Sequence, residues 1–334
     1  MARKARICVS GAIHHVTANL VDNRTLLTDE EDKKKFLDLL HNHLTLTGFE
    51  LLSLNFYQTH YHIVLRINDN PLEALFRGFH SEFARYHNKR HGHKGYFFQG
   101  RPKSVVVQDG ESAQKLMSYV HTGPIRAGLC KTIEELDAFS DGTHCTVMGT
   151  GSSHFPFLKA DSVLSLFNNN AGTDPKVLYR ESIKQFIKNV QSDKDFFNWI
   201  KGSNRNKEDM FDPGYWVIGS QKFVQDAMEK DSLKRARVSK FRIYGWNHDN
   251  LAQHVAWVTS VPISELKNRG RLNSLSDARK LYCYFAVKVL HMTTISTALK
   301  LDVSRTAVAR MAKLGKVIAE KKQLQLPENP LSSN

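Results

Sequence analysis

Two histidines stand one residue apart in "YQTHYHIVLR", residues 57–66, a stretch whose alternation is typical of a β-strand. Because successive strand residues point to opposite faces, residues two apart share a face. One predicted face carries Tyr57, Thr59, Tyr61, Ile63 and Leu65, and the other carries Gln58, His60, His62 and Arg66, with Val64 as an apolar exception. The first face needs a covering layer of helices. The second is open to two interpretations, a metal and anion site or a pair of hydrogen-bonded histidines.

The elements predicted around this strand indicate an α+β domain. In chain order they are a strand within 6–20, a helix at 28–48 capped by Thr28, strands at 50–56 and 59–67, a helix at 71–90, a short strand after Pro102 and a helix at 110–122. This order predicts an antiparallel sheet covered by helices. A turn-rich stretch at 143–156 predicts a linker, and residues 160–230 have a mostly helical pattern.

The positive charge is concentrated toward the C-terminal end. The chain carries a net charge of +14, and residues 231–334, with 18 basic and 7 acidic side chains, account for +11 of it. A positive segment joined to a near-neutral body indicates a polyanion partner, nucleic acid before a membrane surface. A solvated basic face has the same composition and stays an alternative.

Hydropathy and cysteine spacing exclude several classes of protein. No apolar run approaches the roughly 18 residues of a membrane span, and the first residues lack the apolar core of a signal peptide. We therefore expect a cytoplasmic location and no membrane partner. The cysteines Cys8, Cys130, Cys145 and Cys283 form no CxxC pair, which argues against a disulfide framework and a zinc ribbon.

Near the C-terminus, "TTISTALKLDVSRTAVARMAKL", residues 293–314, has the pattern of two short helices that meet at "KLDVS". The predicted internal contacts are Ala298, Leu301, Val303, Val308 and Leu314. Ser304 would cap the second helix. Arg305, Thr306 and Arg310 would then face outward, and side chains of these types contact bases and phosphates in the major groove. An ordinary helical hairpin with a basic surface is the alternative.

The helix "ESAQKLMSYVHTGPIRAG" carries a narrow apolar stripe at Ala113, Leu116, Met117 and Val120. Tyr119 lies about a third of a turn from the centre of that stripe, given 3.6 residues per turn. We expect Tyr119 to emerge at the edge of the packed face, either as an amphipathic edge residue or as a reactive group.

Several motifs occur together in a fixed order: "HHVT" at 14–17, "THYHIVL", "NKRHGHKGYFFQGR" at 88–101, "YFFQGRPKSVVV" and "YVHTGPIRAGL". In that order and spacing they resemble the REP-associated tyrosine transposases, relatives of the single-tyrosine HUH transposases, over about residues 3–150. The C-terminal helices, with "SLSDARKLYCYFAVKVL" upstream, resemble the DNA-binding domain of the replication initiator DnaA, which some of these relatives carry.

The resemblance implies a metal-dependent tyrosine transposase, a single-stranded DNA endonuclease and strand transferase active in DNA transposition and recombination. His60 and His62 would hold Mg²⁺ or Mn²⁺ against the scissile phosphate. Tyr119 would attack the phosphorus of hairpin-associated single-stranded DNA, leaving a 5′-phosphotyrosine and a free 3′-hydroxyl. Because a phenol is mostly protonated at neutral pH, positive charge from the metal or Lys115 would stabilise the attacking phenolate. Tyr86 and Tyr96 are the next candidates for the nucleophile.

The sequence departs from the family pattern at the expected third metal ligand. Gly123 stands where the family has asparagine or glutamine, and Thr59 stands where it has the asparagine before the first histidine. A glycine has no side chain to coordinate. The candidates to complete the site are His121, Gln58, Glu111 or a water. The DNA-contacting residues expected in this domain are Arg66, Arg101 and Lys103.

We therefore predict four segments: an HUH catalytic domain at 1–150, a helical connector at 151–240, a helix-turn-helix domain at 241–320 and a disordered tail at 321–334. The first domain would bind single-stranded or hairpin DNA, and the helix-turn-helix would bind duplex DNA. The protein would act as a monomer or homodimer. The alternative function is a catalytically impaired, HUH-derived DNA-binding regulator, and a further rival is a metal-dependent phosphodiesterase or RNA-binding protein that uses the same sheet.

Overall fold

The computed structural model of the chain describes residues 6–22, 24–150, 155, 157–168, 172–189, 217–268 and 273–330. The chain divides into two compact units, Met1–Asp231 and Ser232–Asn334. The first is mixed α and β and the second is helical. Much of the predicted connector, residues 151–154, 156, 169–171 and 190–216, lies outside the described residues.

The first unit is built on one five-stranded sheet in the order β2-β3-β1-β4-β5. The strands are β1 (Ile13–Asn19), β2 (Glu50–Phe56), β3 (His60–Arg66), β4 (Lys103–Val107) and β5 (Val217–Ile218). The first four pair antiparallel, as the sequence predicts. β5 instead pairs parallel to β4, so the expectation of a wholly antiparallel sheet is wrong at this edge. The broader prediction of an α+β architecture is confirmed.

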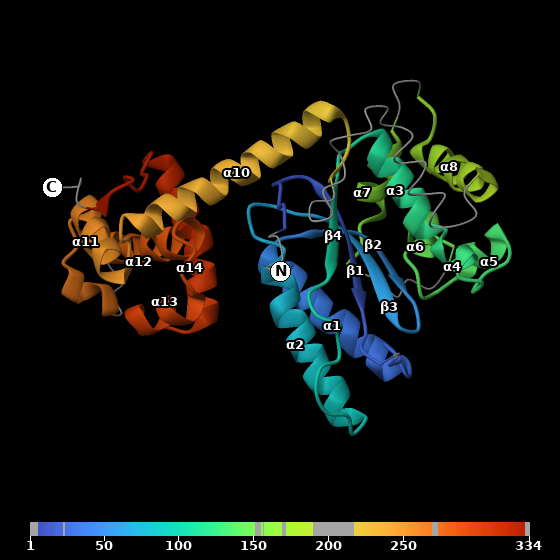
Figure 1. Ribbon diagram of the computed structural model, residues 1–334, viewed down its shortest axis with the longest axis horizontal. Helices are drawn as coiled ribbons and strands as arrows, with labels where there is room; N and C mark the ends of the chain where they lie inside the picture. The colour runs from blue at the N-terminus through green and yellow to red at the C-terminus, as the bar shows by residue number, and fades with distance from the viewer. Residues whose placement is uncertain are drawn as a thin grey trace. The chain divides into compact units, whose positions relative to one another are not determined.

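Two long helices, α1 (Glu30–Thr47) and α2 (Glu73–Arg90), cover one face of this sheet and lie side by side (Figure 1). The alternation of β3 explains the packing, because Tyr61, Ile63 and Leu65 are fully buried. The Phe36 ring of α1 lies 5.2 Å from the Tyr61 ring. The N-terminal cap of α1 is Asp29 and not Thr28, since the Asp29 side chain accepts a hydrogen bond from the Asp32 amide.

The opposite face of the sheet is covered by α3 (Glu111–His121) and the short helices that follow it. These are α4 (Gly123–Arg126), α5 (Ile133–Ala138), α6 (His144–Met148), α7 (Ala160–Leu164) and the longer α8 (Pro175–Asn189). The stretch 143–156 was expected to be a linker, but its described residues contain the helix α6. Buried Tyr179 of α8 explains why, because its hydroxyl bonds to the rings of His121 at 2.7 Å and His144 at 2.5 Å.

The second unit packs helices around its own apolar core. Its elements are the C-terminal part of α10 (Gln221–Ile243), then α11 (His248–Thr259), α12 (Asn273–Tyr284), α13 (Thr294–Leu301) and α14 (Arg305–Lys321), with short turns η2 (Ile263–Lys267) and η3 (Phe285–Val289). Gly315 of α14 meets α12 closely, since a Cβ there would lie 2.0 Å from the Lys280 carbonyl oxygen. A larger residue would force these two helices apart.

Part of the expected disordered tail, residues 321–330, is described and contacts this unit. Leu326 is 5% exposed, and Trp246 donates a hydrogen bond to the Glu328 carbonyl oxygen at 3.0 Å. Residues 331–334 lie outside the described residues. Among the helices that the structure describes, none is both long enough and apolar enough to cross a bilayer.

Candidate active site

The polar face of β3 looks toward α3 and carries both predicted histidines. In the sheet register Thr17 of β1 pairs with His62 on one side and with Lys103 of β4 on the other. Directly paired residues share a face, so Lys103 lies on the same face as the histidines. Its side chain is exposed. The sheet thus presents two imidazoles and a lysine on one face, with β1 between them.

A third histidine joins the pair. His15 Nε2 and His62 Nδ1 form a 2.8 Å hydrogen bond, and the two rings stack with centroids 5.0 Å apart. Burial, followed by the charges of His15, His60 and Arg126, holds the pKa of His62 well below its usual value. His62 is therefore neutral at pH 7, the form in which an imidazole can bind a metal. With Nδ1 engaged by His15, Nε2 is the His62 nitrogen suited to coordination.

Tyr57 lies against the histidines, contrary to the predicted alternation. Its ring stacks on His60 at 4.6 Å and meets the edge of His62 at 5.5 Å. The strand begins only at His60, and the Tyr57 amide donates to the His60 carbonyl oxygen at 2.9 Å, closing a turn. Because residues 57–59 are not part of the strand, the period of two does not apply to them.

Tyr57 also explains the glycine at position 123. A Cβ built on Gly123 would lie 2.0 Å from the Tyr57 hydroxyl oxygen and 3.3 Å from the ring carbon that bears it. The phenol of Tyr57 therefore occupies the space that an asparagine or glutamine side chain at position 123 would need. The glycine and the tyrosine are sterically complementary, and a phenol oxygen stands near the position where the resemblance implies a third ligand.

Tyr119 is brought to the same histidines by α3. Its ring meets His15 edge-on at 6.0 Å and His62 at 6.5 Å. The residue is only 3% exposed, so it is buried and does not emerge at the helix edge as the apolar stripe predicts. The ring of Phe186 of α8 lies 6.4 Å away and helps to cover it.

Arg126 of α4 is the functional candidate that the sequence pattern missed. Its guanidinium carbon lies 4.2 Å from the centre of the Tyr119 ring. One guanidinium nitrogen donates to the Tyr119 carbonyl oxygen at 2.8 Å and the other to the Thr122 hydroxyl at 2.7 Å. These two bonds hold the cation against the phenol, where it can stabilise a phenolate. The available signal was the seven-residue spacing from Tyr119, which is two helical turns.

The remaining candidates for an extra ligand are directed elsewhere. Both ring nitrogens of His121 are bonded, to Tyr179 at 2.7 Å and to Thr143 at 3.2 Å, on the far side of α3. Glu111 and Lys115 form an ion pair with each other near the start of that helix. Gln58 is exposed in the turn before β3.

The two arginine candidates and the alternative tyrosines are also separate from the histidines. Arg66 stands at the other end of β3 and binds Asp109 at 3.1 Å and Glu50 at 3.5 Å. Arg101 is exposed just before β4. Tyr86, on α2, bonds to Glu31 at 3.4 Å, and Tyr96 is 88% exposed. Neither tyrosine contacts an imidazole of the site.

The side chains fit a divalent ion with two protein nitrogens, from His60 and His62. Among the His, Cys, Asp and Glu residues that the structure describes, the single cluster of three close ligand atoms lies elsewhere, at Asp32, His87 and His91. The remaining positions would therefore be left to water, to substrate oxygens and to the Tyr57 hydroxyl. With no carboxylate, this donor set suits Mn²⁺ or a later transition ion better than Mg²⁺.

In the second unit, α13 and α14 are separated by a three-residue turn, residues 302–304, in which Asp302 has a left-handed φ of 51°. The Ser304 hydroxyl accepts from the Ala307 amide at 3.2 Å, as the cap prediction requires. Arg305, Thr306 and Arg310 are exposed on α14. Ala298, Leu301 and Val308 are buried and Val303 is partly buried, but Leu314 is 47% exposed and makes no internal contact of the predicted kind.

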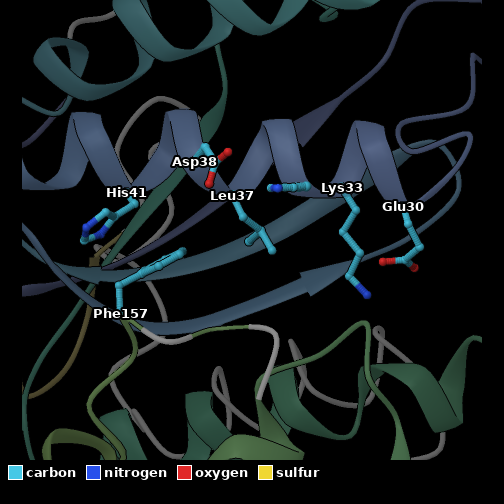
Figure 2. Close-up of a pocket in the computed structure, with 7 residues that line it drawn as sticks. Glu30, Lys33, Leu37, Asp38, His41 and Phe157 are labelled. Atoms are coloured by element: carbon cyan, nitrogen blue, oxygen red, sulfur yellow. The ribbon is translucent and has the colours of Figure 1, made fainter. Parts of the chain in front are cut away.

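A pocket of about 510 Å³ lies elsewhere, along α1. Figure 2 shows Glu30, Lys33, Leu37 and His41 on one side of α1 with Phe157 facing them. The His41 and Phe157 rings stack at 5.0 Å. None of the residues predicted for catalysis or DNA binding lines this pocket.

No family model and no curated protein matches this chain. Among solved structures, the chain is similar to a REP-associated tyrosine transposase bound to a REP hairpin, with 15% sequence identity and a TM-score of 0.39. The match covers 52% of this chain and 98% of that protein.

Proposed function

We propose that the first unit cleaves and rejoins single-stranded DNA through a covalent bond to Tyr119. The observation that supports this best is the convergence of one buried phenol, two imidazoles and one guanidinium. The Arg126 guanidinium carbon lies 4.2 Å from the centre of the Tyr119 ring, and His15 and His62 meet the ring's edges at 6.0 and 6.5 Å. A phenol is a poor nucleophile until nearby positive charge and a base favour the phenolate.

In the proposed reaction the Tyr119 oxygen bonds to phosphorus and the bond from phosphorus to the 3′ oxygen breaks. The phenolic proton ends on that oxygen, giving a 5′-phosphotyrosine and a free 3′-hydroxyl. Arg126 stabilises the phenolate, and His15 is the neighbouring imidazole that can relay the proton. When bound at His60 and His62, a divalent ion supplies Lewis-acid polarisation of the phosphoryl oxygen. Rejoining reverses these steps, so no nucleotide cofactor is required.

The burial of Tyr119 places one requirement on this reaction. At 3% exposure the ring is closed to a phosphodiester. Phe186 of α8 is one of the residues in contact with it. We therefore expect DNA binding to be coupled to movement of this cover, and a substrate that cannot move it should bind without being cut.

A second candidate is a DNA-binding regulator that no longer cuts. Two observations favour it: the phenol of Tyr57 stands where a third ligand is implied, and Tyr119 is covered. Lys103 and the histidines would then serve as a phosphate-binding surface alone. The two candidates differ in a single product, the covalent protein–DNA adduct.

The deciding experiment is incubation with an end-labelled, hairpin-flanked single strand and Mn²⁺, followed by denaturing electrophoresis. We expect a labelled band that resists denaturant in the wild-type protein and in Tyr96→Phe, a matched control at an 88% exposed tyrosine. Tyr119→Phe should lose the band while retaining DNA binding. A wild-type protein that binds the strand without forming the adduct would support the regulator instead. An adduct that survives Tyr119→Phe would assign the nucleophile to another tyrosine.

We propose duplex DNA as the ligand of the second unit, contacted by Arg305, Thr306 and Arg310 on α14. These side chains are exposed, and residues 231–334 carry 18 basic against 7 acidic residues. Each phosphate contact adds about 0.9 to the slope of log affinity against log salt. Removing residues 232–334 should therefore lower duplex affinity and flatten that slope, while single-strand cleavage by the first unit survives.

A further inference from the structure

A second group of metal-ligating side chains joins the start of α1 to the end of α2. Asp32 comes from the first turn of α1, and His87 and His91 come from the last turn of α2 and its cap. The ligand atoms of the three lie within 4.8 Å of one another. Since these helices cover the apolar face of the sheet, this group is separate from His60 and His62.

His87 is the member whose environment points to a missing ligand. The residue is 2% exposed, and neither of its ring nitrogens has a hydrogen-bond partner. Its Nε2 faces Asp32 Oδ2 at 3.7 Å, beyond hydrogen-bonding distance. A buried imidazole without a hydrogen-bond partner, close to a carboxylate, is an arrangement that a bound cation would satisfy.

The charge around this group is also suited to a divalent cation. Arg90 forms ion pairs with Asp29, Glu31 and Asp32. These three carboxylates outnumber Arg90 and the nearby Arg24, so the charge around the group stays negative and favours a cation. Arg90 binds Asp32 at Oδ1, 2.7 Å away. Oδ2 is directed at the two histidines and also accepts a hydrogen bond from the Thr28 amide at 3.0 Å.

We propose that Asp32, His87 and His91 form a binding site for a late first-row transition ion of the Zn²⁺ class. With metal–ligand distances of about 2.1 Å, adjacent ligand atoms of a tetrahedral zinc site lie about 3.4 Å apart. Asp32 Oδ2 now lies 2.9 Å from His91 Nε2 and 3.7 Å from His87 Nε2. Both separations reach the required value with shifts of about 0.5 Å or less.

The sequence around the site has the ligand spacing of a helical zinc site. His87 and His91 are four residues apart, which places two imidazoles on one helix face. His91 bonds to Asp32 through Nε2, so coordination requires its ring proton to sit on Nδ1 instead. A water or exposed His93, whose ring lies 6.2 Å from that of His87, would complete four-coordination. Two imidazoles and one carboxylate select zinc-like ions over Mg²⁺ and Ca²⁺.

A bound ion would clamp the N-terminal turn of α1 to the C-terminal turn of α2. It would thereby stabilise the layer that supports the histidine strand from behind, with no part in the chemistry at Tyr119. Because binding to the folded state alone raises stability, this role predicts metal-dependent melting of the full-length protein. The site does not depend on the function proposed for the other face.

The test is titration of the metal-free, full-length protein with Co²⁺, read by visible ligand-field absorption, with Zn²⁺ then added as competitor. We expect one Co²⁺ to bind the wild type in four-coordinate form, in addition to any ion held at His60 and His62, and added Zn²⁺ to displace it and raise the melting temperature. His60→Ala is the control at the other histidine site: it should weaken the ion held there and leave the four-coordinate spectrum unchanged. His87→Phe should weaken binding by ~100-fold or more.

The His87→Phe protein also reports on folding, because the new ring can pack where His87 meets Phe97 at 4.4 Å. We expect it to melt no lower than the metal-free wild type, since no hydrogen bond is lost. His91→Gln, at a less buried ligand, provides a second variant with the same expected loss of binding. Three results would each overturn the site. The Co²⁺ spectra of the wild type and of His87→Phe could be equal, the cobalt could be purely six-coordinate, or the signal could be lost in His60→Ala alone. All three results leave the test for the Tyr119 adduct unaffected.

Discussion

Replacing Gly123 with alanine tests whether Tyr57 fills the third-ligand position. The new Cβ would lie 2.0 Å from the Tyr57 hydroxyl oxygen, whereas non-bonded atoms settle at about 3.5 Å or more. Tyr57 must therefore move off His60, on which its ring now stacks at 4.6 Å. Gly123 is the first residue of α4 and has no positive φ, although Pro124 after it disfavours a helical backbone for a residue with a Cβ.

The expected magnitude follows from these opposing effects. Overpacking costs about 1–3 kcal/mol, and loss of the Tyr57–His60 stack costs roughly 0.5–1.5 kcal/mol. The higher helix propensity of alanine returns up to about 1 kcal/mol. We therefore expect Gly123→Ala to lower the free energy of unfolding by about 1–3 kcal/mol, which for a unit of this size lowers the melting temperature by ~2–4 °C per kcal/mol.

Urea unfolding of a double-mutant cycle measures the effect. In a Tyr57→Ala background the obstacle is absent, so Gly123→Ala should cost clearly less free energy than it does in the wild type. Tyr57→Phe should be intermediate, because it removes the hydroxyl but keeps the ring carbon 3.3 Å from the new Cβ. Manganese binding should also depend on Tyr57, because Gly123→Asn can add a ligand only when Tyr57 has been replaced. If Gly123→Ala costs the same free energy with and without Tyr57, the steric explanation is wrong.

Three further predictions address other parts of the protein. Arg126→Ala should lower adduct formation at least tenfold and destabilise the first unit by about 0.5–2 kcal/mol, since it removes a partly desolvated cation from the Tyr119 ring. If the variant forms the adduct at the wild-type rate, Arg126 has no part in the mechanism. Burial lowers the pKa of His80 to about 3. In the unfolded chain this histidine takes up a proton near pH 6.5. The free energy of unfolding should therefore be at its full value above pH 6.5 and fall as the pH drops toward 3. His80→Gln should reduce the slope of that free energy against pH, measured by urea unfolding, by up to ~1.4 kcal/mol per pH unit. Arg305→Ala with Arg310→Ala should weaken duplex binding and reduce the salt slope by about 2 if each contacts one phosphate, and an unchanged slope would place the DNA elsewhere.

Local periodicity explains which parts of the fold could be predicted. The alternation of β3 correctly placed Tyr61, Ile63 and Leu65 in the core, and the cap at Ser304 was found because its partner is three residues away. The errors occur where a local pattern ends. Tyr57 precedes the strand by three residues and turns to the opposite face from the one expected. The segment at 143–156 is polar and turn-rich, yet His144 is buried because Tyr179, 35 residues later, bonds to it.

What the sequence determined by itself was the pair His60 and His62 on one face of a strand, the helix that carries Tyr119, and the basic character of the C-terminal unit. Only the tertiary structure decided which groups stand beside them: His15 bonds to His62 across 47 residues, and Arg126 covers the Tyr119 ring. It also shows that Asp32 and His87, 55 positions apart in the printed sequence, share one cluster. The physical reason is that strand and helix periods fix the direction of a side chain relative to its own element. Which side chain it meets depends on how the elements pack, and that packing is set by contacts distant in the sequence.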